Sequence, residues 1–326
     1  MIAASLESIL KTLTVADKKA LIETLSRDVL KVEANGIFHN LTSNTTKCPH
    51  CGSYHIVKNG LLKGKQKFLC KDCGTNFSIQ TKTPLQNTKK PVEIWSQYIN
   101  LMVDGLSLRA IAENLKINLK TAFYWRHKIL TAIQSVKSTK LSGIVEADET
   151  YFPKSNKGSK NLPAGTARKR GKSKFSVSKR GLSKNQVCVI TALDRNNHYF
   201  NQPCGYGKVQ IMWIRQNLSP QIVKGSTLVT DGDKSYKTLN NVKLIQIVGG
   251  ITNDKRYNIA RTNAYHNDLK HFLDRFRGVA TKYLDYYVNF FKAIKISNLN
   301  FDNVVSINTY TRQEDINNKI EFKRAA

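Results

Sequence analysis

The most specific chemical pattern in the chain is a set of four cysteines arranged in two pairs. Cys48 and Cys51 form one CxxC motif, and Cys70 and Cys73 form a second one after a gap of 18 residues. A β-hairpin in this gap would return the second pair to the first, and four thiolates in a tetrahedron suit a structural Zn²⁺ ion. The alternative, two structural disulfides, conflicts with the cell interior that we expect for this sequence. We therefore predict a zinc ribbon over residues 46–80, whose partner is either DNA or another protein.

A second pattern places acidic residues at the ends of apolar stretches. LSGIVEADETYF runs into Asp148, and GSTLVTDGDKSY runs into Asp231. Carboxylates at the ends of buried strands are costly to desolvate unless they are paired or bind a cation, and Mg²⁺ prefers such oxygen ligands. Either aspartate alone could be a turn residue or a helix cap. Three more acids lie near enough to confuse the assignment: Glu146, Glu149 and Asp233.

A third pattern lies in RTNAYHNDLKHFLDRF, residues 261–276. As a helix, this segment has an apolar face made by five residues: Tyr265, Leu269, Phe272, Leu273 and Phe276. A different face carries Asn263, His266, Asn267 and Lys270. The polar face is either an ordinary solvated surface or part of the site that the two aspartates suggest.

The net charge points to a polyanionic partner. The chain has 52 Lys and Arg residues against 23 Asp and Glu, a formal charge of +29 with a pI near 9.9. A codon bias towards Lys and Asn explains only part of this excess, because acids are scarce. We expect nucleic acid rather than an anionic membrane surface, since no basic amphipathic helix dominates and no apolar run could span a bilayer.

The segment 154–184 holds eleven basic residues and no acid. Its Gly- and Ser-rich composition predicts a loop that orders on DNA through phosphate contacts, or else a solvated insertion. Its densest basic cluster is the predicted contact: Arg168, Lys169, Arg170 and Lys172.

Residues 88–137 predict three helices. Pro91 suits the first turn of the first, Ser107 suits the cap of a short second one, and Asn118 suits the cap of the third. This is the layout of a helix-turn-helix, in which the third helix reads DNA; the alternative is an ordinary three-helix packing unit. Five side chains of the third helix are predicted to meet phosphates or bases: Lys120, Thr121, Tyr124, Arg126 and His127.

Residues 141–296 alternate apolar and polar segments. Three strands, a helix, a further strand and more alternation describe an RNase H-like α/β domain. In that layout the first and fourth strands lie side by side, so Asp148 and Asp231 would meet, and a late helix would supply a third ligand. The predicted fold class is therefore multidomain α+β: a zinc ribbon, a helix-turn-helix, then an RNase H-like α/β catalytic domain.

Together these segments resemble a known family. The CxxC…CxxC pair, the helix-turn-helix, EADETYF, TDGDKSY and TNAYHNDLKHFLDRFRGVATKYL are similar to the insertion-sequence transposases of the family numbered fifteen ninety-five, in which an ISXO-like transposase domain follows a zinc ribbon. The resemblance covers roughly residues 46–296. It implies a DDE-type, two-metal enzyme that cuts and rejoins DNA at element ends.

The resemblance also implies roles for single residues. Asp148 and Asp231 would hold Mg²⁺ or Mn²⁺ together with Asn263, because some branches of the family place Asn at the third acidic position with a Lys seven residues on, as Lys270 is here. Lys270 could contact a phosphate, and His266 is a substitute ligand or proton carrier. The implied chemistry is hydrolysis at the element end, followed by attack of the freed 3′-OH on target DNA.

The remaining predictions concern the ends of the chain, the location and assembly of the protein, and its alternative functions. Residues 1–45 are expected to form a helical segment, and residues 297–326 a polar tail. We expect a bacterial, cytoplasmic, nucleoid-associated protein that acts as a homo-oligomer on double-stranded DNA, both element ends and target. One alternative function is that of a catalytically inactive, transposase-derived DNA-binding regulator. Another is that of a nuclease that cuts DNA without joining it.

Overall fold

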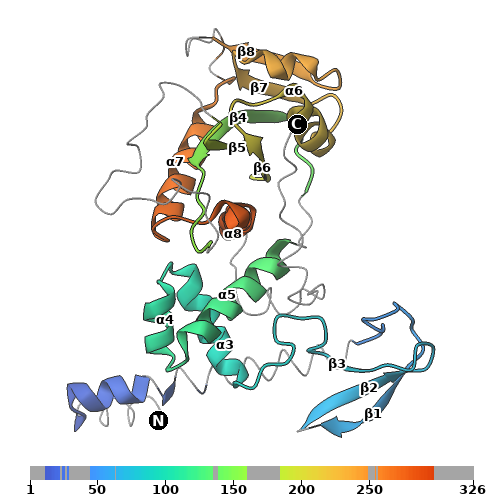
Figure 1. The fold of residues 1–326 in the computed structure, drawn as a ribbon, viewed down its shortest axis with the longest axis vertical. Coiled ribbons are helices and arrows are strands. Elements are labelled where there is room, and N and C mark those ends of the chain that lie inside the picture. The colour runs from blue at the N-terminus through green and yellow to red at the C-terminus, as the bar shows by residue number, and fades with distance from the viewer. Residues whose placement is uncertain are drawn as a thin grey trace, which may run out of the picture. The chain divides into compact units, whose positions relative to one another are not determined.

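The computed structural model describes residues 12–22, 24, 25, 28, 45–62, 64–134, 139–159, 184–248, 254 and 256–296. These residues fall into two compact units that divide between Arg126 and His127, and each unit is described by itself (Figure 1). Of the predicted N-terminal helical segment, residues 15–22 are helical. Several predictions fall outside the described residues: most of the basic insertion, with Arg168, Lys169, Arg170 and Lys172, and the polar tail 297–326.

The cysteine module forms a three-stranded antiparallel sheet in the order β1–β2–β3. Its strands are β1 (Ile56–Leu62), β2 (Lys65–Cys70) and β3 (Asn76–Ser78). Phe68 and Phe77 stack with their ring centroids 5.4 Å apart and form a small core with Cys48 and Cys70. The predicted hairpin between the two cysteine pairs is therefore present.

Three helices follow, and their ends are set by local chemistry. They are α3 (Val92–Val103), α4 (Leu108–Asn114) and α5 (Leu119–Gln134). The Ser107 hydroxyl accepts a hydrogen bond from the Ala110 amide at 3.2 Å, and the Asn118 side chain accepts one from the Lys120 amide at 2.8 Å. Both predicted caps are therefore present. Each accepts a hydrogen bond from a backbone N–H group that has no partner within the first helical turn.

Aromatic packing joins the first and third of these helices. The rings of Trp95 and Trp125 stack at 3.9 Å, and the Tyr98 hydroxyl donates to the Ala122 carbonyl at 2.5 Å. This contact fixes the N-terminal half of α5 against α3. None of the described helices is long and apolar enough to cross a membrane.

The second unit is built on a five-stranded mixed sheet in the order β6–β5–β4–β7–β8. The strands are β4 (Ile144–Pro153), β5 (Gln186–Asp194), β6 (Tyr199–Tyr206), β7 (Thr227–Asp231) and β8 (Lys243–Ile247). The first three are antiparallel neighbours, whereas β7 pairs parallel with β4 and β8 pairs parallel with β7. The predicted adjacency of the first and fourth strands is confirmed.

Helices cover both faces of this sheet. One face carries α7 (Ala260–Asp274) and α8 (Leu284–Ile296), and the other carries α6 (Ile211–Trp213) with its continuation η1 (Ile214–Leu218) (Figure 1). Three short turns complete the unit: η2 (Ser219–Gln221), η3 (Lys234–Thr238) and η4 (Thr281–Tyr283). The helix predicted between the third and fourth strands begins at Ile211.

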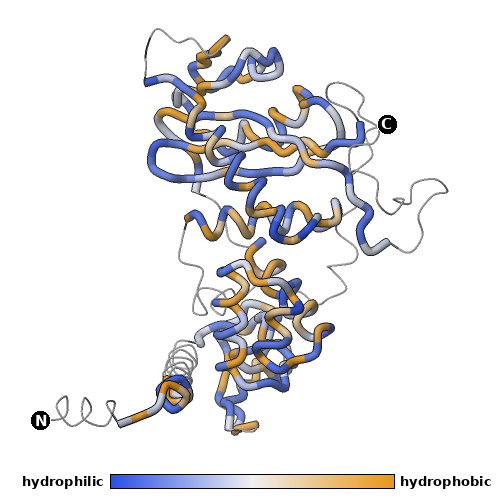
Figure 2. Tube along the Cα trace, turned by 90° about the vertical axis from the view of Figure 1, so that its left-hand side faces the viewer, coloured by the Kyte–Doolittle hydropathy of each residue, from blue (hydrophilic) through white to orange (hydrophobic). Residues whose placement is uncertain are grey.

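Strand alternation decides which side chains face which helix. Figure 2 shows hydrophobic segments, in orange, alternating with hydrophilic ones, in blue, along the chain. On β4, Val145 and Ala147 are buried in the core cluster that contains Trp213, so Glu146 and Asp148 must face the opposite side, where α7 packs. Of the two remaining cysteines, Cys188 belongs to this same core and Cys204 packs against it.

The close approach of β6 to α6 gives a test of the core. A Cβ atom added at Gly205 would lie 2.7 Å from Cη2 of Trp213, so Gly205→Ala should lower the free energy of unfolding by about 1–3 kcal/mol through overpacking. Urea denaturation measures this change. In a double-mutant cycle with Trp213→Phe, the two changes should be coupled, because the smaller ring removes the clash. A cost as small as that of Gly232→Ala, whose added Cβ meets its nearest neighbour at 3.4 Å, would contradict this account.

Candidate functional site

The four cysteines of the ribbon form a tetrahedral cluster. Their Sγ atoms all lie within 4.8 Å of one another; Cys48 and Cys73 are 3.7 Å apart, and Cys51 and Cys70 are 3.6 Å apart. Zn–S bonds of about 2.3 Å in a tetrahedron place sulfurs about 3.8 Å apart, so the cluster fits zinc. All four are free thiols, too far apart for the bond of about 2 Å in a disulfide. The disulfide alternative is therefore excluded.

Two matching turns hold these sulfurs. Gly52 and Gly74 follow the second cysteine of each pair with φ angles of 78° and 67°, a region that favours glycine. Their amides donate to the carbonyls of Cys48 and Cys70, each at 2.9 Å. Each CxxC motif thus forms the same compact knuckle, and each knuckle presents two sulfurs to one point.

Asp148 and Asp231 lie level with each other on adjacent parallel strands. The register of β4 and β7 pairs Ile144 with Thr227 and Glu146 with Val229. Continued by two residues, it places Asp148 opposite Asp231. Parallel neighbours are about 4.8 Å apart, and residues level in such strands point to the same face. The structure therefore brings these two carboxylates together.

Their proximity is visible in the electrostatics of Asp148. Burial, together with the negative charge of Asp231, raises the pKa of its carboxyl group to about 6. The Glu149 amide and the positive charge of Lys270 oppose the shift. At neutral pH the site therefore holds two carboxylates that repel each other in a poorly solvated place, and a bound cation would relieve this repulsion.

Helix α7 adds an imidazole directly beside Asp148. The Nδ1 atom of His266 lies 3.7 Å from Oδ2 of Asp148, and the histidine is only 5% exposed. Burial, together with the charge of Lys270, lowers the pKa of His266 to about 4. The imidazole is therefore neutral at neutral pH, and its buried Nε2 atom has no hydrogen-bond partner among the described residues. A neutral imidazole in this place can donate a hydrogen bond or bind a metal.

The other two predicted residues of α7 lie on its exposed side. Asn263 and Lys270 are both solvent-exposed. Lys270 is near enough to change the pKa of both Asp148 and His266, so its ammonium group lies at the open side of the site. In the described part of the chain, no hydrogen bond joins Asn263 to either aspartate. The direct neighbour of Asp148 on this helix is thus His266.

Three nearby acids could compete with these aspartates, and two of them are already engaged. Both oxygens of Glu146 are occupied: Oε2 accepts from the Arg261 amide at 3.0 Å, and Oε1 pairs with Arg195 at 2.9 Å. Asp233 pairs with Lys208 at 3.0 Å and accepts from the Ser235 amide at 2.8 Å.

The third competing acid, Glu149, follows Asp148 on β4 and therefore points to the opposite face. Burial raises its pKa to about 7, although the nearby Tyr236 hydroxyl lowers it. That hydroxyl falls short of hydrogen-bond geometry with Glu149. Asp148 and Asp231 are therefore the acids best placed to share an ion.

The aspartate pair fits a hard cation that keeps part of its water shell. Within the described ranges, only the cysteine cluster brings three or more His, Cys, Asp or Glu ligand atoms within 4.8 Å of one another, so Asp148, Asp231 and His266 do not close a cage. Mg²⁺ does not need one, because it is commonly held by one or two carboxylates and completed by water and phosphate oxygens. The residues present therefore fit Mg²⁺ or Mn²⁺.

The predicted DNA-contacting residues of α5 divide into two groups. Lys120 and Tyr124 are exposed and lie together, with the ammonium 5.8 Å from the ring centroid, and Thr121 is half-buried. Arg126 is only 2% exposed and donates to the Leu106 carbonyl at 3.0 Å. His127 is only 4% exposed and packs on the Tyr283 ring at 4.4 Å. The last two are turned inward, which corrects their assignment as DNA contacts.

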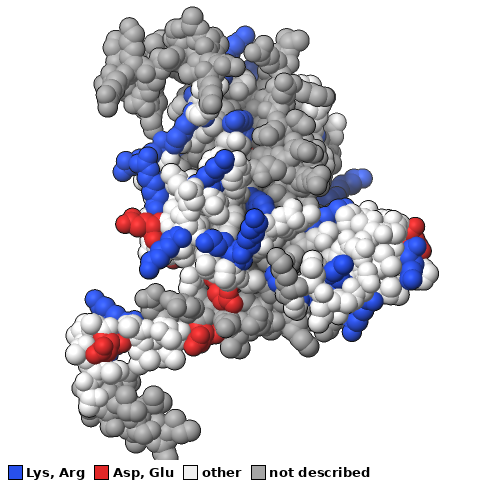
Figure 3. Space-filling view, turned by 60° about the horizontal axis from the view of Figure 1, so that its bottom comes forward, with Lys and Arg blue, Asp and Glu red and all other residues white. Residues whose placement is uncertain are grey.

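The surface agrees with the excess of positive charge in the sequence. On the face shown in Figure 3, Lys and Arg side chains are much more frequent than Asp and Glu. A helix residue that contacts a phosphate must be exposed. Of the five residues of α5 predicted to contact DNA, Lys120 and Tyr124 meet this condition.

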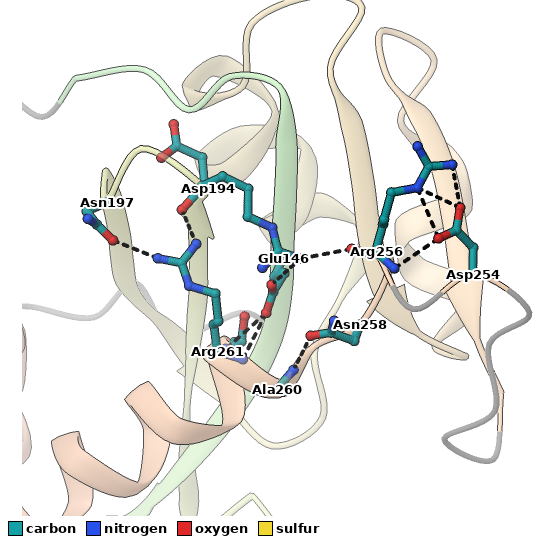
Figure 4. A network of polar contacts seen from close by, with 10 residues as sticks. Glu146, Asp194, Asn197, Asp254, Arg256, Asn258, Ala260 and Arg261 are labelled. Carbon is teal, nitrogen blue, oxygen red and sulfur yellow. Dashed lines mark hydrogen bonds and ion pairs between the residues drawn. The ribbon is translucent and has the colours of Figure 1, made fainter.

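Sequence reasoning missed the residues that hold Glu146, two positions before Asp148. Arg195 lies in the turn between β5 and β6 and pairs with the Glu146 carboxyl group. Arg261, in the first turn of α7, donates its backbone amide to the same group (Figure 4). Lys208, which pairs with Asp233, was missed as well. No local pattern marks these contacts, because each joins segments far apart in the sequence; only the burial of Glu146 on the face of Asp148 could have suggested a partner.

Comparison with known proteins finds a family match within the second unit and relatives that cover a larger part of the chain. Residues 140–292 match the model of the ISXO2-like transposase domain. An uncharacterized protein in the transposable element ISH50 of Halobacterium salinarum is 26% identical over 203 residues, which are 60% of this chain. The chain spans 65% of that relative's length.

Two solved structures also match, at low similarity. A pre-cleavage Mos1 transpososome is 11% identical, with 70% of this chain and 82% of that chain covered and a TM-score of 0.20. The Mos1 mariner paired end complex with Mn is 12% identical, with 69% and 81% covered and a TM-score of 0.19. At these scores neither structure bears on the site described above.

The sulfur geometry predicts bound zinc. The purified protein should contain about one zinc ion per chain, measured by atomic emission, and Cys51→Ser should lose it because three thiolates and a hydroxyl bind zinc more weakly. Cys204→Ala, outside the cluster, should keep the metal. Equal zinc contents in both variants would contradict the assignment.

The electrostatics predict that Asp148→Asn stabilises the protein when no divalent cation is added. The pKa of Asp148 rises from 3.8 to about 6 on folding, so the folded state carries an unfavourable charge above pH 6 that disappears below about pH 4. Two pKa units correspond to about 3 kcal/mol. We expect a gain of about 1–3 kcal/mol in the free energy of unfolding at pH 8 and less than about 1 kcal/mol at pH 4, measured by urea denaturation.

The control for this measurement is Asp268→Asn, which removes an exposed carboxylate paired with Lys295. It should change stability by less than about 1 kcal/mol at either pH. An Asp148→Asn gain of the same size at pH 4 and pH 8 would show that the carboxyl charge is not its cause.

Proposed function

Residues 140–292 carry an ISXO2-like transposase domain, and from this premise we propose that the protein cuts DNA at the ends of an insertion sequence and joins the freed ends to target DNA with the help of divalent cations. The observation that carries the proposal is the proximity of Asp148 and Asp231 on adjacent parallel strands. The strand order β6–β5–β4–β7–β8, with three antiparallel strands followed by two parallel ones, supports an RNase H-like domain for this chemistry.

The two aspartates would hold Mg²⁺ or Mn²⁺, and the third ligand would come from α7. When bound, such ions lower the pKa of an attacking water or 3′-OH and offset charge on the leaving oxygen. Asn263 remains the ligand that the family resemblance implies, and its exposed amide would have to turn towards the aspartates. His266 is the alternative, supported by its place beside Asp148 and its unpartnered Nε2 atom.

The protein's own side chains would position the DNA. Lys270 lies at the open side of the aspartates, where its ammonium group could bind the phosphate next to the scissile bond. The neutral imidazole of His266 can keep the Asp148 carboxylate oriented. Because the imidazole carries no positive charge, it would not compete with a bound cation for that carboxylate. Most of the rate would come from such positioning, as in other phosphoryl transfers.

The first unit would supply binding. The cysteine cluster would hold a structural Zn²⁺ ion, and α3, α4 and α5 would act as a helix-turn-helix in which Lys120 and Tyr124 contact double-stranded DNA. The basic segment 154–184 would add phosphate contacts. Since two element ends must be brought together, we expect a homo-oligomer on DNA.

A DNA-binding regulator without catalytic activity is the second candidate. It is supported by Asn263, which lies exposed and offers a neutral amide where many members of the resembled family have a carboxylate. The two candidates differ in one reaction, metal-dependent nicking of a duplex that carries the element's ends.

Strand cleavage should depend on both aspartates. Asp148→Asn and Asp231→Asn should each reduce Mn²⁺-dependent nicking at least about 10³-fold, because the ions lose a charged ligand, and should leave end binding within about twofold. Nicking is measured on labelled duplexes, and binding by gel shift. Asp233→Asn, whose carboxylate is engaged by Lys208, should keep activity within about tenfold.

The outcomes separate the candidates. Normal nicking by Asp148→Asn would falsify the active-site assignment. Tight binding of element ends by the unmodified protein without any nicking in Mg²⁺ or Mn²⁺ would favour the regulator, and nicked products that are never joined would favour a simple nuclease.

A further inference from the structure

Helix α7 begins without a cap of its own. The residue before it, Ile259, makes no side-chain hydrogen bond to the helix, and the first turn has no acidic residue. The first N–H groups of a helix need acceptors, and a negative charge is favourable at this end. The Ala260 amide finds the side chain of Asn258 at 3.2 Å, and the next two amides find an acceptor on another element.

That acceptor is Glu146 of β4. Its Oε2 atom accepts hydrogen bonds from the amides of Arg261 at 3.0 Å and Thr262 at 3.3 Å. Its Oε1 atom pairs with Nη2 of Arg195 at 2.9 Å. The carboxylate is only 1% exposed. A buried charge is unfavourable unless it is compensated, and here a helix N-terminus and a guanidinium group compensate it together.

A wider network fixes the same corner (Figure 4). The guanidinium of Arg261 donates to the Asp194 carbonyl at 2.8 Å and to the Asn197 side chain at 2.6 Å. Arg195 also donates to the Arg256 carbonyl at 3.0 Å. The start of α7 is thus tied both to β4 and to the turn between β5 and β6, with Glu146 at the centre.

The spacing of these contacts connects Glu146 to the aspartates. His266 lies four residues after Thr262, about 6 Å along a helix, and Asp148 lies two residues after Glu146, about 6.6 Å along a strand. Glu146 contacts Thr262, and Asp148 lies beside His266. The step between these two contacts is about the same length along β4 as along α7, and the two elements run in the same direction. A shift of α7 at its first turn would move every residue that it presents to Asp148.

We propose that Glu146 is a positioning residue, which holds α7 in the register that places His266 beside Asp148 and Lys270 near enough to act on its charge. Its own oxygens are occupied by the helix and by Arg195, so it acts through α7 and not on the DNA. This role rests on the proposed strand cleavage for its effect on rate, but its effect on α7 can be measured without any activity.

The test compares Glu146→Ala and Glu146→Gln with Gly205→Ala, a destabilising variant on the other face of the sheet. A Cβ atom added at Gly205 would overpack against Trp213 in the core. Gly205→Ala should therefore destabilise the unit without removing any contact at the start of α7, which makes it the control for a general loss of stability. All variants are compared as the full chain, at a temperature where each is folded by circular dichroism.

The first readout is hydrogen exchange of the peptides covering residues 258–266, followed by mass spectrometry. Glu146→Ala should increase exchange there at least about tenfold, because the amides of Arg261 and Thr262 lose their acceptor. Glu146→Gln keeps an acceptor oxygen and should show a smaller increase. Gly205→Ala should leave this segment protected. Unchanged exchange in Glu146→Ala would overturn the proposal.

The second readout is Mn²⁺-dependent nicking of end-bearing duplexes. A displacement of about 1 Å in a reacting group can cost about 100-fold in rate, so kcat should fall about 100-fold in Glu146→Ala and less in Glu146→Gln, whereas the Kd for DNA stays within about twofold. Gly205→Ala should keep kcat within about threefold. Equal kcat losses in Glu146→Ala and Gly205→Ala would reduce Glu146 to a merely stabilising residue. If the unmodified protein does not nick DNA, the proposed function fails, and exchange at residues 258–266 still decides for or against Glu146.

Discussion

The repulsion between two carboxylates on neighbouring parallel strands is the constraint on which this structure depends. Asp148 and Asp231 meet because β7 crosses back to lie beside β4 in a register that sets them level. A fold selected for stability alone has no use for this pair, since burial and repulsion by Asp231 both oppose the ionisation of Asp148. Such a pair is useful in a site that must bind a hard cation and a phosphate, because the two carboxylates provide the negative charge that the cation needs.

The rest of the second unit can be understood as support for that pair. The apolar side of β4 anchors the strand in the core with Trp213, while its polar side meets α7. Helix α7 brings a neutral imidazole behind Asp148 and an ammonium group to its open side. Since a helix is rigid, one anchored turn at its start can determine where these groups lie two turns later.

Local patterns predicted much of this arrangement, and long-range contacts account for what they missed. The spacing of the cysteines and the aspartates at the ends of apolar stretches were visible because each is contained within a few residues. The cap of α7 was not visible, because Glu146 lies 115 residues before the amide it accepts from. Arg126 and His127 looked like surface residues by type, and only the packing of α5 shows that they are buried. The same periodicity that grouped Asn263 with His266 could not say which of them faces Asp148.

The most direct test of the central claim is a crystal of the protein soaked in Mn²⁺ and measured at the manganese absorption edge. The account predicts an anomalous peak shared by the carboxylates of Asp148 and Asp231, at about 2.2 Å from an oxygen of each, with water and a group from α7 completing the shell. An empty site at millimolar Mn²⁺, or manganese bound elsewhere with these two carboxylates turned apart, would contradict it.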